Sequence, residues 1–158
     1  MRAVVQRVSR ATVRVSDEVR GRVGHGLLVF LGTMRDDNAT DLDWMVRKLV
    51  GLRIFSDDAG KMNRSVVDVA GGILLVSQFT VCADVEKGTR PSFSRAMEPT
   101  RAREMLEAAR VRLAESVPTE TGEFGAHMEV ELVNDGPVTL WLDSRRGDGP
   151  LPMSSEFS

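Results

Sequence analysis

The stretch Gly26-Leu27-Leu28-Val29-Phe30-Leu31-Gly32 decides the fold of this 158-residue chain. It is a continuous apolar run of strand length with a glycine at each end, which is typical of a strand buried on both faces. A second run of this kind, Ile73-Leu74-Leu75-Val76, follows two glycines and leads directly into the polar sequence Ser77-Gln78-Phe79-Thr80. The chain therefore contains two candidate central strands, and one of them ends in polar side chains.

Shorter strands joined by turns are predicted around these two runs. Residues 128–132 alternate apolar and polar side chains, which indicates a strand with one face in water. Residues 20–24 combine turn chemistry with a short return strand. The remaining strands are expected at residues 4–8, 11–15, 53–56 and 138–142.

Two helices are predicted outside the strands. The first has Thr40 as its N-cap, with Asp43 as an imperfect capping-box partner, and ends at Gly51. The second starts near Pro99, a good residue for the first helical position, and ends before Pro118. Its apolar stripe consists of Ala102, Met105, Leu106, Ala109 and Leu113.

These elements predict an α+β fold. We expect a single domain with a curved, antiparallel-rich sheet or β-barrel-like sheet and the two main helices packed outside it. The domain is expected to span residues 1–142. Residues 143–158 are rich in Gly, Pro, Ser and charge, so we interpret them as a flexible C-terminal tail.

Composition narrows the class of protein. Hydrophobic residues make up 42% of the chain and charged residues 28%, as in an ordinary soluble globular protein. No apolar stretch approaches the roughly 20 residues of a membrane span, and charge near the N-terminus argues against a signal peptide. Cys82 is the lone cysteine, so no intramolecular disulfide is possible and a cytoplasmic location is the default expectation.

The charge balance restricts the kind of nucleic-acid partner. The net charge of −2 argues against a protein that coats long nucleic acid, but it leaves room for one that grips the end of an RNA. Basic residues gather around Arg90 and Arg95 and again along the second predicted helix. We interpret the helical arginines as solvated surface charge.

Several familiar catalytic schemes are missing. The sequence has no HExxH motif, no Cys/His cluster, no GxSxG elbow and no P-loop. His127 is interpreted as a surface histidine on a polar strand face. Cys82 follows an apolar run and is interpreted as a small buried residue rather than a nucleophile.

Ser77, Gln78 and Thr80 are the remaining candidates, and two interpretations are open. Their side chains could satisfy a strand end or a turn. Alternatively, these groups and the strand-end backbone N–H groups could form the polar floor of a pocket, able to stabilise an oxyanion that develops on an ester carbonyl.

The sequence Asn134-Asp135-Gly136-Pro137-Val138-Thr139 also has two interpretations. A Gly-Pro pair between two strands is commonly a turn. The alternative is a cis peptide at Gly136-Pro137 that aims two carbonyl oxygens in one direction and acts as a steric and electrostatic gate.

Seven segments, taken together and in order, resemble the D-aminoacyl-tRNA deacylase family, also known as D-tyrosyl-tRNA deacylases. The match extends over about residues 1–142 and includes an entire NDGPVT motif. The pair Val81-Cys82 replaces the Leu-Ala that commonly follows SQFT in the family. The matching segments are residues 6–8, 53–56, 60–63, 76–80, 90–94, 121–128 and 134–139.

The resemblance implies a homodimer with its active site at the interface. The Gly136-Pro137 element of one subunit would reach into the pocket of the other, hold the α-amino group of the substrate and leave no room for an L side chain. Arg7 would brace this element, while Phe124 and Met128 would line the pocket near it. No metal or cofactor is expected.

The implied reaction is hydrolysis of the ester between a D-amino acid and the terminal adenosine of tRNA, with rejection of L-aminoacyl-tRNA. Glycine has no side chain, so glycine mischarged on tRNA should pass the gate. Thr80 matches a position proposed as nucleophile, and another view assigns activation of water to the 2′-hydroxyl of the adenosine. Under either view, the backbone N–H groups of Phe79 and Thr80 are the oxyanion-hole candidates.

Two alternatives belong to other classes of function. One is a non-catalytic module of the same fold that binds nucleic-acid ends. The other is a Thr-dependent esterase that acts on small molecules, for which free D-aminoacyl esters would be good substrates.

Overall fold

β1 is the strand around which the sheet is built. The computed structural model describes residues 1–86 and 88–145, and in it β1 (Arg2–Val15) pairs antiparallel with three strands. Its first half pairs with β3 (Gly26–Gly32) and its second half with β2 (Glu18–Val23). Along its other edge runs β8 (Glu129–Asp143), which contacts β1 from end to end.

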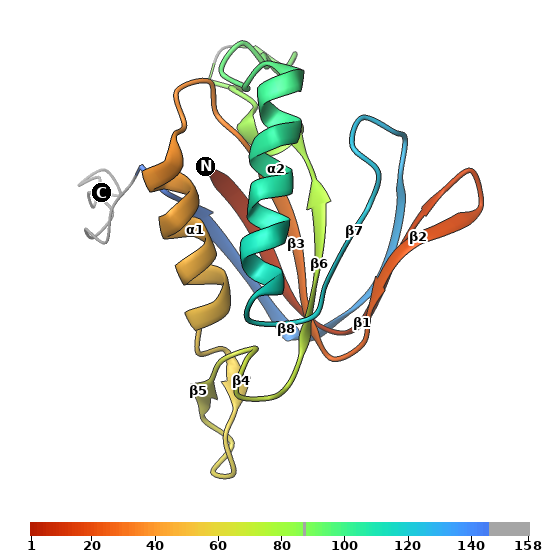
Figure 1. Cartoon of the computed structure of the whole chain (residues 1–158), viewed down its shortest axis with the longest axis vertical. Coiled ribbons are helices and arrows are strands. Elements are labelled where there is room, and N and C mark those ends of the chain that lie inside the picture. The colour runs from red at the N-terminus through yellow and green to blue at the C-terminus, as the bar shows by residue number, and fades with distance from the viewer. Residues whose placement is uncertain (87, 146–158) are drawn as a thin grey trace.

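The two apolar runs form adjacent parallel strands. β6 (Gly72–Ser77) pairs in parallel with β3, and β7 (Thr119–Thr121) pairs in parallel with β6. The sheet order is β2-β1-β3-β6-β7, with β8 added to β1, so antiparallel and parallel pairs share one curved sheet (Figure 1). The predicted α+β fold with a barrel-like sheet is confirmed. A separate hairpin of β4 (Phe55–Ser56) and β5 (Met62–Arg64) includes one strand, β5, that we did not predict.

Both predicted helices are present and lie on the same face of the sheet (Figure 1). They are α1 (Ala39–Gly51) and α2 (Pro99–Ala114), and Asp43 of α1 pairs with Arg112 of α2. The predicted N-cap at Thr40 is wrong, because Asn38 caps α1. The Asn38 side chain accepts from Thr40 N at 2.8 Å, while Asp41 accepts from Asn38 N at 3.0 Å, which makes a reciprocal capping box.

Burial of β3 and β6 on both faces is confirmed. Leu27 and Val29 pack into the main core beneath the helices, together with Leu49 and Leu113. Leu28, on the opposite face of β3, belongs to a second apolar cluster. The other buried members of that second cluster are Val8, Ala11, Val13, Leu74 and Val76. The two central strands therefore lie between two apolar layers, which fixes their register and direction.

The two ends of the described chain meet beside β1. Ser144 N donates to Met1 O at 2.9 Å, and the Arg2 and Asp143 side chains form an ion pair at 3.1 Å. The tail predicted for residues 143–158 lies outside the described residues from 146 onward. Among the helices that the structure describes, none has the length and apolar character required to cross a bilayer.

A buried ion pair offers a test of this arrangement. The α-ammonium of Met1 lies 2.8 Å from Asp37 Oδ1, and both groups are fully buried, whereas the neighbouring Asp36 side chain is 77% exposed. Because Asp37→Asn leaves the buried ammonium with only the more distant Asp41 carboxylate, whose Oδ1 lies 4.0 Å away, we expect it to lower the free energy of unfolding by about 3 kcal/mol. Urea denaturation measures this value. Asp36→Asn is the matched control, and equal midpoints for the two variants would contradict the prediction.

Candidate functional site

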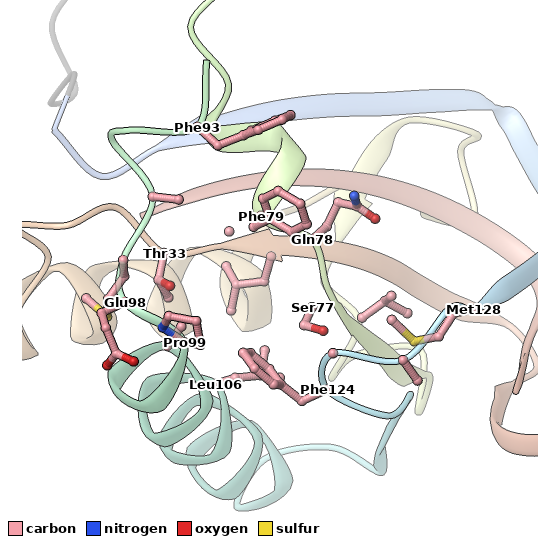
Figure 2. Close-up of a pocket in the computed structure, with 18 of the residues that line it drawn as sticks. Thr33, Ser77, Gln78, Phe79, Phe93, Glu98, Pro99, Leu106, Phe124 and Met128 are labelled. Atoms are coloured by element: carbon pink, nitrogen blue, oxygen red, sulfur yellow. The ribbon is translucent and has the colours of Figure 1, made fainter. Parts of the chain in front are cut away.

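A cavity of about 670 Å³ opens at the carboxyl ends of the parallel strands β3 and β6. One wall consists of the strand ends and the other of the first turns of α2, with the segment 124–128 closing the side (Figure 2). Carboxyl ends of neighbouring parallel strands are the usual place for binding sites, because the loops that follow them diverge there. We therefore regard this cavity as the candidate site.

A close contact shapes the floor of the cavity. After β6 ends, the chain turns into a short 3₁₀ helix, η1 (Phe79–Cys82), while Gln78 N still donates to Leu31 O at 2.9 Å. A Cβ atom at Gly32 would lie 2.5 Å from Val81 Cγ2 and 2.8 Å from Gln78 O. Glycine at position 32 therefore lets η1 lie directly over the end of β3.

Some of the candidate residues in this turn line the cavity, and one does not. Ser77, Gln78 and Phe79 line the cavity, and Ser77 Oγ has no hydrogen-bond partner among residues 1–86 and 88–145. Thr80 is exposed and is not among the lining residues, and its Oγ1 accepts a hydrogen bond from Gln78 Nε2. The N–H groups that open a helical turn have no acceptor within it, which leaves those of Phe79 and Thr80 available.

Of the titratable groups at the cavity, Glu98 is already engaged as a helix cap. Glu98 caps α2 by accepting from Thr100 N at 3.0 Å and from Arg101 N at 3.3 Å, and these bonds lower the pKa of its carboxyl. His127 lines the cavity from an exposed position just before β8, not on the strand itself. Within the described residues, no group of three or more His, Cys, Asp or Glu side chains could hold a metal ion.

Cys82 is buried, as predicted. Its thiol donates to Thr33 O at 3.5 Å, and burial raises the pKa of this thiol to about 11. A thiol with such a pKa is almost entirely protonated at neutral pH, so it is a poor nucleophile.

Aromatic side chains and a thioether form the apolar part of the cavity. The rings of Phe79 and Phe93 meet edge to face at 4.9 Å between centroids, and they are 58% and 38% exposed. Phe124 and Met128 line the opposite part (Figure 2), and the Arg103 guanidinium lies 4.9 Å from the centroid of the Phe124 ring. An exposed aromatic pair beside a cavity is suited to stacking against a flat ligand.

The segment Asp135–Val138 is not a turn between two strands. Gln6 pairs with Thr139 and Val8 with Asn134, so Arg7 alone faces four residues of β8. Both halves of β8 pair with the same strand, and the segment between them is displaced from the ladder. The turn interpretation is therefore wrong, and the Gly136-Pro137 peptide is cis.

Asn134 closes the base of the displaced segment. Its Nδ2 atom donates to Arg7 O at 2.9 Å and to Val138 O at 3.1 Å. The amide thus replaces two backbone partners that the interrupted ladder cannot supply. This explains why an asparagine precedes the displaced segment.

Arg7 supports the segment from inside. Its guanidinium is buried, and Nη1 donates to Ile54 O at 2.5 Å. Nε lies 3.0 Å from Asp135 Oδ2, which is close enough for an ion pair but is not aligned for a hydrogen bond. A Cβ atom at Gly136, whose φ is +122°, would lie 2.8 Å from Val138 N and 3.0 Å from Arg7 Nη2. The Arg7 guanidinium and the backbone at Gly136 are therefore in close contact.

The structure brings together only part of the predicted site. Of the predicted residues, Ser77, Gln78, Phe79, Phe124 and Met128 line the cavity. Arg7, Gly136 and Pro137 form a second group, and Gly136 and Pro137 are exposed. Within the described part of one chain, none of these three lines the cavity.

Sequence reasoning missed one side of the cavity. The first turns of α2, with Glu98, Pro99 and Leu106, and the end of β3, with Thr33, also line it. A usable signal was present for Thr33, because it follows an apolar glycine-bounded run just as Ser77 follows the other run. The contribution of α2 depends on the path of a long loop and has no local signal.

Comparison with known proteins relates the whole domain to one family. Residues 4–143 match the family described as D-Tyr-tRNA(Tyr) deacylase. The chain is 58% identical over 147 residues to the D-aminoacyl-tRNA deacylase of Anaeromyxobacter dehalogenans, an alignment that covers 92% of this chain and 99% of that relative. It is 51% identical over 146 residues to the D-aminoacyl-tRNA deacylase of Kosmotoga olearia, covering 92% and 99% of the two chains.

A solved structure is similar over the same region. The structure titled "c-Myc DNA Unwinding Element Binding Protein" superposes with a TM-score of 0.87 at 41% sequence identity. The match covers 90% of this chain and 98% of that one.

Proposed function

The chain belongs to the D-Tyr-tRNA(Tyr) deacylase family, and we propose that it hydrolyses the ester between a D-amino acid and the terminal adenosine of tRNA. The observation that carries this proposal is the pairing of a polar-floored cavity at Ser77–Phe79 with a separate, braced segment at Gly136 and Pro137. The cavity can hold the ester, and the Gly136-Pro137 segment presents an exposed backbone surface that can discriminate the configuration at the α-carbon.

The cavity has the features that an aminoacyl-adenosine requires. Its aromatic pair, Phe79 and Phe93, offers ring faces and edges for a base, and Leu106 and Met128 offer apolar contact for the rest of the ligand. The N–H groups of Phe79 and Thr80, at the start of η1, are our proposed donors to an oxyanion that develops on the ester carbonyl. The unpartnered Ser77 hydroxyl adds a further polar group beside them.

We assign Thr80 a positioning role rather than that of a nucleophile. Its Oγ1 accepts from Gln78, and neither a carboxylate nor an imidazole of the described residues contacts it to remove its proton. Activation of the attacking water by the 2′-hydroxyl of the adenosine requires no such base from the protein. This chemistry needs no metal or cofactor.

Chiral discrimination is proposed to arise between two copies of the chain. Gly136 and Pro137 are exposed but lie outside the cavity of their own chain. Val133 and Trp141, on the same strand, are exposed apolar side chains that a partner would cover. In a homodimer with twofold symmetry, each Gly136-Pro137 element would enter the cavity of the other subunit, accept hydrogen bonds from the α-amino group and exclude an L side chain.

The first test is deacylation of matched D- and L-aminoacyl-tRNA by the purified protein in the presence of EDTA. We expect hydrolysis of the D form to exceed that of the L form by about a thousandfold or more, since a steric clash worth about 4 kcal/mol is sufficient. Glycyl-tRNA should be hydrolysed at high enzyme concentration, because glycine has no side chain to clash with the gate.

The related structure titled as a DNA-unwinding-element binding protein supports a second candidate, a module that binds nucleic-acid ends without catalysis. The same assay separates the two. If neither aminoacyl-tRNA is hydrolysed while tRNA or DNA ends are bound, the binding module is the better assignment.

Replacement of Thr80 tests the catalytic assignment. We expect Thr80→Ala to stay within about tenfold of the wild-type kcat, whereas loss of a true nucleophile costs about 10⁴-fold or more. Thr80→Ser is the matched control, because it keeps the acceptor for Gln78 Nε2. Loss of all activity in Thr80→Ala, together with good activity of the wild type on free D-aminoacyl esters, would favour the Thr-dependent esterase instead.

Replacement of Gly136 tests the gate. An added Cβ would meet Val138 N and Arg7 Nη2, so Gly136→Ala must displace the segment. A displacement near 1 Å costs about a hundredfold in rate, so we expect kcat/KM for D-aminoacyl-tRNA to fall by about this factor and the D/L ratio to shrink. Gly60→Ala is the control, because Gly60 also has positive φ but nothing lies within 4 Å of its added Cβ. An unchanged D/L ratio in Gly136→Ala would contradict the gate.

A mixture of variants shows whether the gate acts in the partner subunit. Ala126→Trp fills the cavity from the segment that closes it, while Gly136→Ala leaves the cavity intact. If the gate acts across a dimer, subunits exchanged between the two variants restore about a quarter of wild-type activity, since half of the dimers are mixed and each has one competent site. If activity does not recover after subunit exchange has been verified, the Gly136-Pro137 element acts on the cavity of its own chain.

A further inference from the structure

A second, smaller cavity shares a wall with the first. Its volume is about 200 Å³, and Arg35 and Ser94 line both cavities. The wall is an antiparallel contact in which Met34 bridges to Ala96 and Arg35 N donates to Arg95 O at 2.9 Å. The two cavities therefore lie on either side of the backbone contact between residues 34–35 and 95–96.

The second cavity carries an excess of positive charge. Three arginines line it, Arg35, Arg95 and Arg145, against one acidic residue, Asp36. Arg145 is occupied, because its Nη1 lies 3.9 Å from Asp36 Oδ2 and its Nε lies 3.4 Å from Asp37 Oδ1. Within residues 1–86 and 88–145, Arg35 and Arg95 have no acidic partner. Two uncompensated guanidinium groups thus lie together in a chain whose net charge is −2.

The guanidinium of Arg35 is also held in place. Its Nη2 donates to Ser94 O, a carbonyl of the shared wall, which leaves Nε and Nη1 for a ligand. A guanidinium presents its donors in a planar fork that matches the oxygens of a phosphate, and one that is fixed beforehand loses less side-chain entropy on binding.

We propose that the second cavity binds phosphate groups of the tRNA 3′ strand that immediately precede the terminal adenosine. This inference rests on the proposed function, because an adenosine in the first cavity brings the adjoining phosphodiesters to the shared wall at Arg35 and Ser94. The first cavity then recognises the aminoacyl-adenosine, and the second distinguishes an aminoacylated RNA from a free aminoacyl ester of adenosine by its phosphates.

The test compares two substrates that differ in these phosphates. D-aminoacyl-tRNA carries them, and the D-aminoacyl ester of adenosine lacks them. We expect the ratio of kcat/KM for the tRNA to kcat/KM for the adenosine ester to fall about fivefold in Arg95→Gln and about twentyfold in Arg35→Gln/Arg95→Gln. Arg47→Gln, on the exposed face of α1, is the control and should keep the wild-type ratio.

Binding of uncharged tRNA gives a readout that does not depend on catalysis. The slope of log Kd against log salt concentration should become less steep by about 0.7 for each arginine replaced in the second cavity, because each phosphate contact to a single strand releases about that many counterions. The same change in Arg47→Gln would show a general charge effect and would overturn the site.

The outcomes also separate this inference from the proposed function. An unchanged substrate ratio and an unchanged salt slope in Arg35→Gln/Arg95→Gln would overturn the phosphate site while leaving the deacylase assignment intact. If the wild type hydrolyses neither substrate but the salt slope still falls in the variants, the phosphate site stands and the deacylase assignment fails.

Discussion

The parallel pairing of β3 and β6 is the constraint on which the other elements depend. Both strands are covered by apolar layers on their two faces, so their backbone groups must find partners inside the sheet. Parallel strands end at the same edge, and this brings Thr33 and Ser77 to one cavity although they are far apart in sequence. Gly32 then allows η1 to fold over that edge. The cavity is thus a consequence of strand direction and of one missing Cβ atom.

The position of the Asp135–Val138 segment depends on a different feature, an interruption of strand pairing. The β1–β8 ladder is interrupted where Arg7 faces Asp135–Val138, and the Asn134 amide replaces lost backbone contacts by donating to Arg7 O and Val138 O. The buried Arg7 guanidinium donates to Ile54 O and lies beside the Asp135 carboxylate. The segment is therefore both exposed and supported by contacts from β1, as the proposed specificity element requires. The segment lies outside the cavity of its own chain, which is why the proposed gate requires a second copy.

Much of the architecture was predictable because local patterns agree with the global fold. The two buried runs, α1 and α2 follow from apolar periodicity, and the polar floor follows from hydroxyl and amide side chains at a strand end. The cap at Asn38 was missed although its signal is local, because its reciprocal partner Asp41 stands three residues on. Other features depend on tertiary context. The turn interpretation of Gly136-Pro137 failed because one strand, β1, pairs with both flanking halves. The wall from α2 and the arginine pair beside it are set by a loop path that no period in the sequence encodes.

The order of strands along the chain has a consequence for biosynthesis. Of the strands in the described residues, β1 is synthesised first, and β8, which covers one of its edges from Arg2 to Arg14, is synthesised last. The Met1 and Ser144 contact closes this ladder only when the described chain is almost fully synthesised. Until then the 14-residue strand β1 keeps one row of backbone donors and acceptors unpaired. Such a late, long-range closure slows folding and lengthens the time in which nascent chains are open to edge-to-edge association or to capture by chaperones.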